Sequence, residues 1–366
     1  MSGIQKRSID LIHWFKSLKK TDRLLLVGFL IAVVLSVFCL MLIPQFFYQT
    51  SKIQPSDDKQ TQAVIEPTYR HPLTGSLLYE EKISLPQVFS VMIDNHEDAW
   101  PPSGLEEAFL VIEAPVEGGI SRTLAFFSNE QEVEKIGPVR SARPYFLDWA
   151  NELDAVYTHV GGSNAALDLI ASGGTFDLNE YWWGDYFWRS NDRYAPHNVY
   201  TSTKLLNEYY EFREEQGKTP ERLYGFWKFK DPESVPTVVS QIHIDFSTPV
   251  YVVDWVYDSQ TQTYTRSQFH QRHLASSGKQ INANNIAVVI TDIDVIDSIG
   301  RREIRTLGEG QAIIFQDGQM IKALWKKSSH TERLAFYDAQ SQKEIFMNAG
   351  VTWIEVIESE DELMYQ

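Results

Sequence analysis

The stretch DAVYTHVGGSNAALDLIAS (residues 154–172) combines two kinds of structure within a few residues. It begins as an apolar, β-branched strand, turns at Gly161 and Gly162, and enters a helix that Ser163 or Asn164 can cap. A strand that leads through glycines into a helix is typical of α/β proteins, in which ligands bind at strand ends. The backbone N–H groups at such a helix start also favour an anion.

Neighbouring segments extend this pattern in both directions. Apolar, β-branched runs predict strands over residues 88–94, 108–114 and 120–127. Residues 202–217 predict a second helix, with a hydroxyl at its start and a glycine at its end. We therefore predict a layered α/β domain over residues 83–235.

The pattern changes after about residue 235. Segments that alternate apolar and polar residues follow, and Asp317-Gly318 between two apolar runs is a strong hairpin signal. The segment EIFMNAGVTWIEVI (residues 344–357) predicts another hairpin through its Asn-Ala-Gly. We predict a mostly antiparallel, β-rich C-terminal domain over residues 236–366.

The N-terminal part contains one uncharged apolar segment, residues 24–43, which is long enough to span a bilayer as a helix. Lysines and arginines outnumber acids before it, which predicts a cytoplasmic tail over residues 1–23. Residues 44–82 are then a polar extracytoplasmic tether. The alternative is a cleaved signal peptide, but the apolar segment is too long and no small-x-small site precedes Pro44. We expect a single-pass protein of a bacterial cell membrane, with its bulk outside the cytoplasm.

Charge and cysteine content limit the possible functions. The chain carries a formal net charge of -16, which argues against nucleic acid as a partner, because such binding needs a basic face. The single cysteine, Cys39, lies in the apolar segment, so the remainder can form no intramolecular disulfide. The sequence leaves the oligomeric state open.

The loop IGPVRSARP (residues 136–144) presents two arginines between prolines. Prolines restrict the loop, and two planar guanidiniums held in this way suit carboxylate or phosphate recognition. The alternative is that Arg140 and Arg143 pair with carboxylates such as Glu113 or Glu117 and stabilise the fold. Both interpretations remain open from the sequence.

Other polar residues are expected in the same crevice, because they follow predicted strands or stiff turns. Histidines in such places can move protons near neutral pH, and a carboxylate can act as a base. The predicted ligand-binding residues are Arg122, Arg140, Arg143, His159, Gly161, Gly162, Ser163, His197 and Asn198. The catalytic candidates are Asp94, Glu113, His159 and His197. A histidine bonded to a backbone carbonyl is the alternative for His159 and His197.

A metal site is considered at Asp94, His96 and Asp98, which are spaced by two residues. This spacing is common in polar loops, so we predict no tight metal site and no cofactor. A loosely held Mg²⁺ or Ca²⁺, shared with a ligand phosphate, is the alternative. The aromatic cluster YWWGDYFW (residues 181–188) predicts core packing, with a sugar- or lipid-facing platform as the alternative.

Several strings together resemble the YerB-like bacterial lipoproteins, a family whose domain has no known function. They are VMIDNH, EAPVEGGISR, IGPVRSARPYFLDWA, HVGGS, APHNVYTS and GEGQAIIFQDGQMIKALWKK, in this order from about residue 71 to the C-terminus. The resemblance implies an extracytoplasmic protein. Those relatives usually carry a lipidated cysteine, whereas this chain has the apolar segment.

VMIDN, GPVRSAR and AVYTHVGGSNAALDLI are also similar in order and spacing to the LytR-CpsA-Psr phosphotransferases. That likeness implies phosphoryl transfer from a polyprenyl-linked glycopolymer, with arginines on phosphate oxygens and Asp94 placing a divalent cation. We favour binding of an anionic cell-envelope ligand, and keep a phosphotransferase or hydrolase as the alternative.

Overall fold

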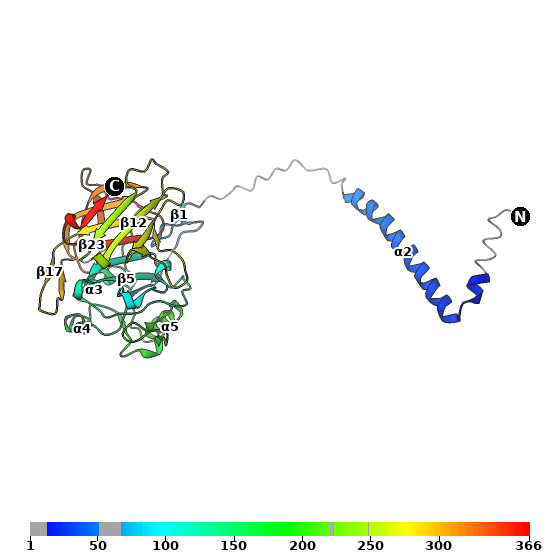
Figure 1. Cartoon of the computed structure of the whole chain (residues 1–366), viewed down its shortest axis with the longest axis horizontal. Coiled ribbons are helices and arrows are strands. Elements are labelled where there is room, and N and C mark those ends of the chain that lie inside the picture. Colours follow the sequence, from blue (N-terminus) through cyan, green and yellow to red (C-terminus); the bar gives the residue numbers. More distant parts are fainter. Residues whose placement is uncertain (1–12, 51–66, 83, 220, 222, 248) are drawn as a thin grey trace. The chain divides into compact units, whose positions relative to one another are not determined.

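The chain divides into two compact units, residues 1–65 and residues 66–366. The structure is a computed structural model (Figure 1). It describes residues 13–50, 67–82, 84–219, 221, 223–247 and 249–366, the side chains of residues 37–50 excepted.

Helix α2 (Lys20–Thr50) is the main element of the first unit and includes the predicted span at residues 24–43. The side chains of residues 37–43, with Cys39, lie outside the described part, and so do residues 1–12 of the predicted tail. Among the side chains that the structure describes, no helix has both the length and the apolar character needed to cross a membrane.

The predicted tether, residues 44–82, is corrected at its C-terminal end. Residues 51–66 lie outside the described part of the chain. Beyond them, β1 (Tyr69–Arg70) and β2 (Leu77–Leu78) form an antiparallel pair. Leu73 in the turn between them is buried, and this apolar contact makes the segment part of the second unit.

A ten-stranded mixed sheet forms the centre of the second unit, with strand order β21-β20-β19-β16-β23-β4-β5-β3-β6-β7. Parallel pairing joins β16 to β23 to β4 and joins β3 to β6 to β7, whereas the other neighbours are antiparallel. The strands are β3 (Val88–Ile93), β4 (Leu110–Pro115), β5 (Ser121–Ser128), β6 (Val156–His159), β7 (Asp177–Asn179), β16 (Asn285–Ile290), β19 (Gly308–Gln316), β20 (Gln319–Lys327), β21 (Ala335–Asp338) and β23 (Thr352–Ile357).

A second, six-stranded antiparallel sheet packs against one face of the large sheet. Its strand order is β14-β13-β12-β11-β24, with β15 paired to β13. Its strands are β11 (Gln241–Asp245), β12 (Val252–Asp258), β13 (Thr263–Gln268), β14 (Gln271–Arg272), β15 (Asn282–Ala283) and β24 (Leu363–Tyr365). Three further pairs are β8 (Trp188–Arg189) with β9 (Val199–Tyr200), β10 (Phe229–Lys230) with β22 (Met347–Asn348), and β17 (Ile293–Val295) with β18 (Arg302–Ile304).

The large sheet crosses the boundary predicted at residues 235/236. β3 to β7 precede that boundary, whereas β16, β19, β20, β21 and β23 follow it. The picture of an α/β layer followed by a separate β-rich domain is therefore corrected. β4 and β23 are buried along their whole length, so each strand needs a neighbour on both edges and covers on both faces. The fold is mixed α/β.

The described part of this unit contains three α-helices: α3 (Pro144–Asn151), α4 (Asn164–Ala171) and α5 (Thr203–Glu214). Ser163 caps α4 as predicted, since its hydroxyl accepts from the backbone N–H of Ala166. Ser202 caps α5 in the same way, through the N–H of Leu205.

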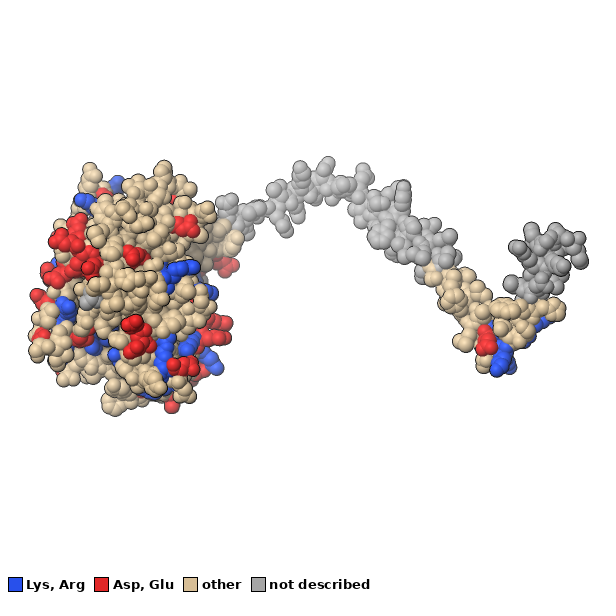
Figure 2. Space-filling model, viewed as in Figure 1, with Lys and Arg blue, Asp and Glu red and all other residues tan. Residues whose placement is uncertain are grey.

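The core has two parts, one on each face of the large sheet. Alternation along β5 separates them, because successive strand residues point to opposite faces. Phe127 belongs to the cluster that contains Trp255 of the second sheet, whereas Phe126 belongs to the cluster that contains Phe146 of α3. The large sheet is thus covered by the second sheet and α5 on one face and by α3 and α4 on the other. Figure 2 shows Asp and Glu spread over the visible surface of this unit, as the net charge of -16 leads one to expect.

Candidate functional site

Asp94 follows β3 directly and is buried at the strand end. Its Oδ2 accepts from Nδ1 of His197 at 2.7 Å and lies 3.0 Å from Nε of Arg140. Its Oδ1 accepts from the backbone N–H of His96 at 3.1 Å. Three predicted site residues, Asp94, Arg140 and His197, therefore meet although they come from different segments.

Backbone hydrogen bonds hold the arginine loop against β3 and against the glycine turn. On the β3 side, the N–H of Arg140 donates to Met92 O at 2.8 Å. On the other side, the N–H of Ala142 donates to Gly161 O at 3.0 Å, and that of Ser163 to Ala142 O at 3.2 Å. Ala142 and Gly162 form a parallel bridge. The predicted neighbourhood of the two loops is thus present in the backbone.

The three arginines of the predicted crevice have different partners. Arg143 makes a bidentate pair with Glu117, with both N–O distances 2.7 Å. Burial alone would raise the pKa of Glu117, but the hydrogen bonds and charge of Arg143 bring that pKa below its ordinary value. Arg140 pairs with Asp94. For Arg143 the structure supports the alternative of a pairing within the fold.

Arg122 lies on β5 and is only 6% exposed. Its Nη1 donates to Ser141 O at 2.8 Å, and it forms no ion pair with any described residue. Burial, together with the charge of Arg143, lowers the pKa of Arg122 to about 10. The predicted crevice therefore contains three guanidiniums, those of Arg122, Arg140 and Arg143, but, among the described residues, only two carboxylates that pair with them, those of Asp94 and Glu117.

His159 forms no hydrogen bond with the three arginines within the described part of the chain. It is fully buried; its Nδ1 lies 2.7 Å from Gly161 O, and its Nε2 lies 3.2 Å from Oδ2 of Asp177 on β7. The alternative of a histidine bonded to a backbone carbonyl is the one observed. Both ring nitrogens are engaged, so His159 is removed from the candidate bases.

The glycine turn is mainly a structural device. Gly161 has a φ of +59°, and a Cβ at this position would lie 2.7 Å from the ring of Tyr181. Its N–H already donates to Oδ1 of Asn179 at 3.0 Å. One of the N–H groups expected to point outward is therefore used inside the fold.

Asn198 also serves local structure. Its Oδ1 accepts from Nη1 of Arg189 at 3.2 Å, and its Nδ2 donates to Ser190 O at 3.3 Å. These bonds join the ends of the β8–β9 pair. His197, the residue before Asn198, extends from this strand pair and contacts Asp94.

Glu113 belongs to a buried group of polar side chains that was not predicted from the sequence. Its Oε2 accepts from Nη2 of Arg266 at 2.6 Å, and both side chains are fully buried. Its Oε1 accepts from Ser121 at 2.5 Å and from Asn95 at 3.1 Å. Glu113 therefore pairs with an arginine of β13 rather than with Arg140 or Arg143.

Glu355 of β23 completes this group. Burial raises the pKa of Glu355 well above its ordinary value, and the charge of Glu113 adds to the shift. Its Oε1 accepts from Nε1 of Trp255 at 2.8 Å. A signal was present in the sequence: β13 alternates, and Arg266 occupies the buried face beside Tyr264 and Gln268, where an arginine needs an acid.

The aromatic cluster at residues 181–188 divides between core and surface. Trp183 packs edge-on against Tyr209 of α5, and Phe187 is buried. Tyr181 and Trp182 are exposed, Trp182 at 79%. Core packing thus accounts for part of the cluster.

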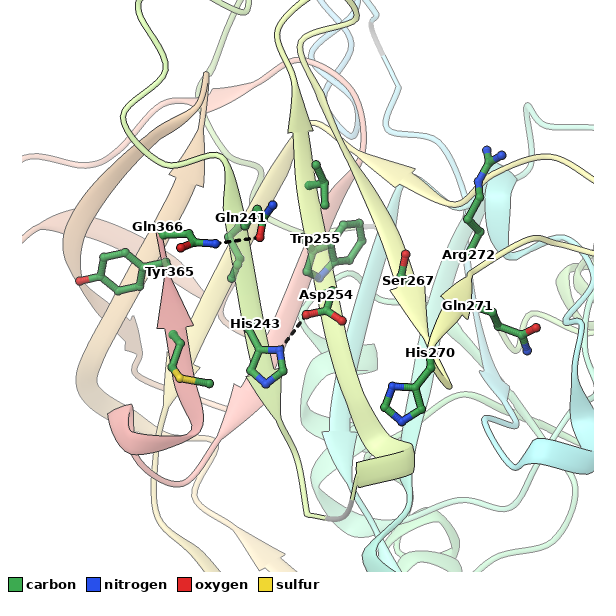
Figure 3. A pocket seen from close by; sticks show the side chains of 13 residues that line it. Gln241, His243, Asp254, Trp255, Ser267, His270, Gln271, Arg272, Tyr365 and Gln366 are labelled. Atoms are coloured by element: carbon green, nitrogen blue, oxygen red, sulfur yellow. Dashed lines mark hydrogen bonds and ion pairs between the residues drawn. The ribbon is translucent and has the colours of Figure 1, made fainter.

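A groove of about 840 Å³ runs over the open face of the second sheet (Figure 3). It is lined by strands β11, β12, β13, β14 and β24 and by His270, none of them part of the predicted site. Within this groove, His243 of β11 and Asp254 of β12 are side by side on neighbouring strands, with Nδ1 and Oδ1 2.7 Å apart.

The chain matches two family descriptions that together span most of its second unit. "Protein of unknown function (DUF3048) N-terminal domain" covers residues 73–241, and its C-terminal counterpart covers residues 242–354. The junction at 241/242 lies close to the boundary predicted at 235/236, although one sheet spans both parts.

A relative from Bacillus subtilis (strain 168), named "Putative lipoprotein YerB", is 32% identical over 291 residues, which are 78% of this chain and 85% of that protein. The crystal structure of YerB protein from Bacillus subtilis superposes with a TM-score of 0.72 and covers 82% of this chain and 100% of that chain. The predicted resemblance to the YerB-like family is confirmed. This chain belongs to the DUF3048 family of proteins of unknown function.

Proposed function

We propose that this protein is attached to the bacterial cell membrane and binds an anionic, phosphate- or carboxylate-bearing component of the cell envelope on the extracytoplasmic side. The name of its relative as a lipoprotein supports this location. The uncharged segment at residues 24–43, with its basic flank, supports a single-pass anchor with residues 1–23 in the cytoplasm.

The observation that carries the binding proposal is the unpaired charge of Arg122. This guanidinium is buried beside two other arginines, and its Nε has no hydrogen-bond partner among the described residues. Burying a charge without a partner raises the free energy of the folded protein, so an anion that binds beside Arg122 would lower that cost. An incoming anion supplies that charge and can form charge-assisted hydrogen bonds.

Arg140 is the arginine that an incoming ligand reaches first. Its side chain is 25% exposed, and its partner Asp94 is shared with His197. An anion can therefore contact Arg140 without breaking the pair to Asp94, because a guanidinium has five N–H donors. Arg143 has its fork occupied by Glu117 and supports the loop.

Titration with inorganic pyrophosphate by calorimetry tests this proposal. Arg140→Met and Arg122→Met should each weaken binding about 10- to 100-fold, the loss of one hydrogen bond to a charged group being worth about 1.5–3 kcal/mol. Arg70→Met is the matched control, since Arg70 on β1 is 27% exposed, pairs with Asp231 outside the predicted site, and should leave binding unchanged. Equal behaviour of all three variants, or no binding by the unmodified protein, would contradict the proposal.

One observation favours the enzymatic alternative. His197 donates through Nδ1 to the buried Asp94, an arrangement in which an imidazole acts as a base. The likeness to the LytR-CpsA-Psr phosphotransferases suggests a polyprenyl-pyrophosphate-linked glycan as the substrate for such a phosphotransferase or hydrolase. Mg²⁺-dependent turnover that disappears in His197→Gln would establish catalysis, and pyrophosphate binding without turnover would establish a binding protein.

A further inference from the structure

His96, Asp98 and His197 form a cluster at the mouth of the site, beyond the end of β3. One ligand atom from each residue lies within 4.8 Å of the other two. We propose that these three side chains bind a divalent transition metal of the zinc class. The set differs from the one considered in the sequence, because His197 takes the place of Asp94. The proposal does not depend on anion binding.

The distances suit a tetrahedral ion. Zinc bonds of 2.0–2.1 Å place neighbouring ligand atoms about 3.4 Å apart and the centres of two bound imidazoles about 5 Å apart. Nδ1 of His96 and Oδ2 of Asp98 are 3.6 Å apart. The ring centres of His96 and His197 are 4.8 Å apart, with the planes inclined by 25°.

Asp94 supplies the support that metal-bound histidines require. Its buried carboxylate holds Nδ1 of His197, so Nε2 is left as the ligand atom. Metal-ligating histidines commonly donate their other nitrogen to a carboxylate in this way, which fixes the tautomer and raises the basicity of the ring. Asp94 is itself held by Arg140 and by the backbone N–H of His96.

The other two ligands can close on an ion at little cost. Asp98 lies in the short helix η1 (Glu97–Ala99), and its side chain is 74% exposed, while that of His96 is 38% exposed. Nδ1 of His96 now accepts from the N–H of Asp98, and a metal would displace this bond near the surface, where water can replace it. Two imidazoles and one carboxylate favour zinc over Mg²⁺ or Ca²⁺, which prefer oxygen ligands.

The test uses the full-length chain after removal of metals with a chelator. Zn²⁺ affinity is measured by competition with a chromophoric chelator, and Co²⁺ is the spectroscopic probe of tetrahedral nitrogen and oxygen ligands. The unmodified chain should bind one ion. His96→Ala and Asp98→Asn should each weaken binding about 100-fold or more, and Asp94→Asn about 10- to 100-fold, as is typical of an outer-shell partner.

His243→Gln is the matched control, because His243 has the same 2.7 Å pair to a carboxylate but lies on the second sheet (Figure 3). It should leave the affinity unchanged, and millimolar Mg²⁺ or Ca²⁺ should not compete. The exposed positions of His96 and Asp98 predict unchanged melting temperatures in the presence of chelator, which separates lost ligands from lost folding. The proposal fails if the unmodified chain binds no stoichiometric Zn²⁺, if His96→Ala and Asp98→Asn bind normally, or if the control variant loses the ion.

Discussion

Glu113→Gln tests how the buried polar group joins the two parts of the second unit. In the native protein, Glu113 on β4 pairs with Arg266 on β13, and both side chains are fully buried. Glutamine can still accept from Ser121, but it leaves the charge of Arg266 unpaired in the core. Breaking a buried ion pair in this way costs about 3–5 kcal/mol of unfolding free energy.

Glu355 determines how much unfolding free energy Glu113→Gln should lose within the range of about 3–5 kcal/mol. Burial and the charge of Glu113 raise the pKa of Glu355, which favours the neutral form of its carboxyl in the native protein. Once Glu113 is glutamine, Glu355 can ionise and compensate the charge of Arg266, and the expected loss is about 3 kcal/mol. Glu355→Gln alone keeps an acceptor for Trp255 and should cost about 1 kcal/mol.

The double variant should then lose more than the sum of the single losses, by about 1 kcal/mol or more, because no acid remains beside Arg266. Urea unfolding of the four proteins at neutral pH measures this coupling. If the losses simply add, Glu355 does not exchange roles with Glu113. If Glu113→Gln costs under about 1 kcal/mol, Arg266 does not depend on this acid and the reasoning on the buried pair is wrong.

Four further outcomes are expected. Arg143→Met removes a bidentate, half-buried ion pair and should lower the unfolding free energy by about 2 kcal/mol in urea titrations. Burial, with a smaller effect from a nearby lysine, lowers the pKa of His71 to about 4. The neutral ring thus contributes stability that is present above pH 6.5 and is lost as the pH falls toward 4, and His71→Gln should flatten this part of a melting-temperature profile. Gly161→Ala introduces a Cβ 2.7 Å from a tyrosine ring at a φ of +59° and should cost about 1–3 kcal/mol by calorimetric melting. Trp182→Ala should change the unfolding free energy by no more than about 0.5 kcal/mol, since this ring is 79% exposed.

Local structure could be predicted from the sequence where short-range chemistry determines it. The hairpin at Asp317-Gly318 is confirmed, with φ values of 56° and 67° at the two residues and Gln316 opposite Gln319. The helices predicted within residues 154–172 and 202–217 are confirmed as α4 and α5, because hydroxyl caps fix their starts.

Long-range pairing could not be predicted in the same way. The hairpin expected within residues 344–357 is wrong: β22 pairs with β10, and β23 inserts between β16 and β4. The β-branched and aromatic residues of β23 indicate a buried strand but carry no information on its neighbours. The division at 235/236 followed from a real change of pattern, which proved not to be a boundary between sheets.

The candidate site was predictable in its components and only partly in its geometry. Strand-end position predicted Asp94 beside the arginine loop, and in the structure Asp94 lies 3.0 Å from Arg140, a pair that was not predicted. His159 was misplaced, because its ring turns toward Asp177, a contact that depends on the pairing of β6 with β7. The contact between the rings of His197 and His96 could not be predicted either, because His197 lies in the loop between β8 and β9, far from His96 in the sequence.

The position of β23 has a consequence for how the protein is made. This strand closes the edge of β4, yet it is synthesised long after β4 and only after the whole second sheet apart from β24. Until it arrives, β4 presents unpaired backbone groups and an apolar surface, the features that attract wrong partners during synthesis. Neither half completes the large sheet by itself, so the regions at residues 73–241 and 242–354 should fold as one piece.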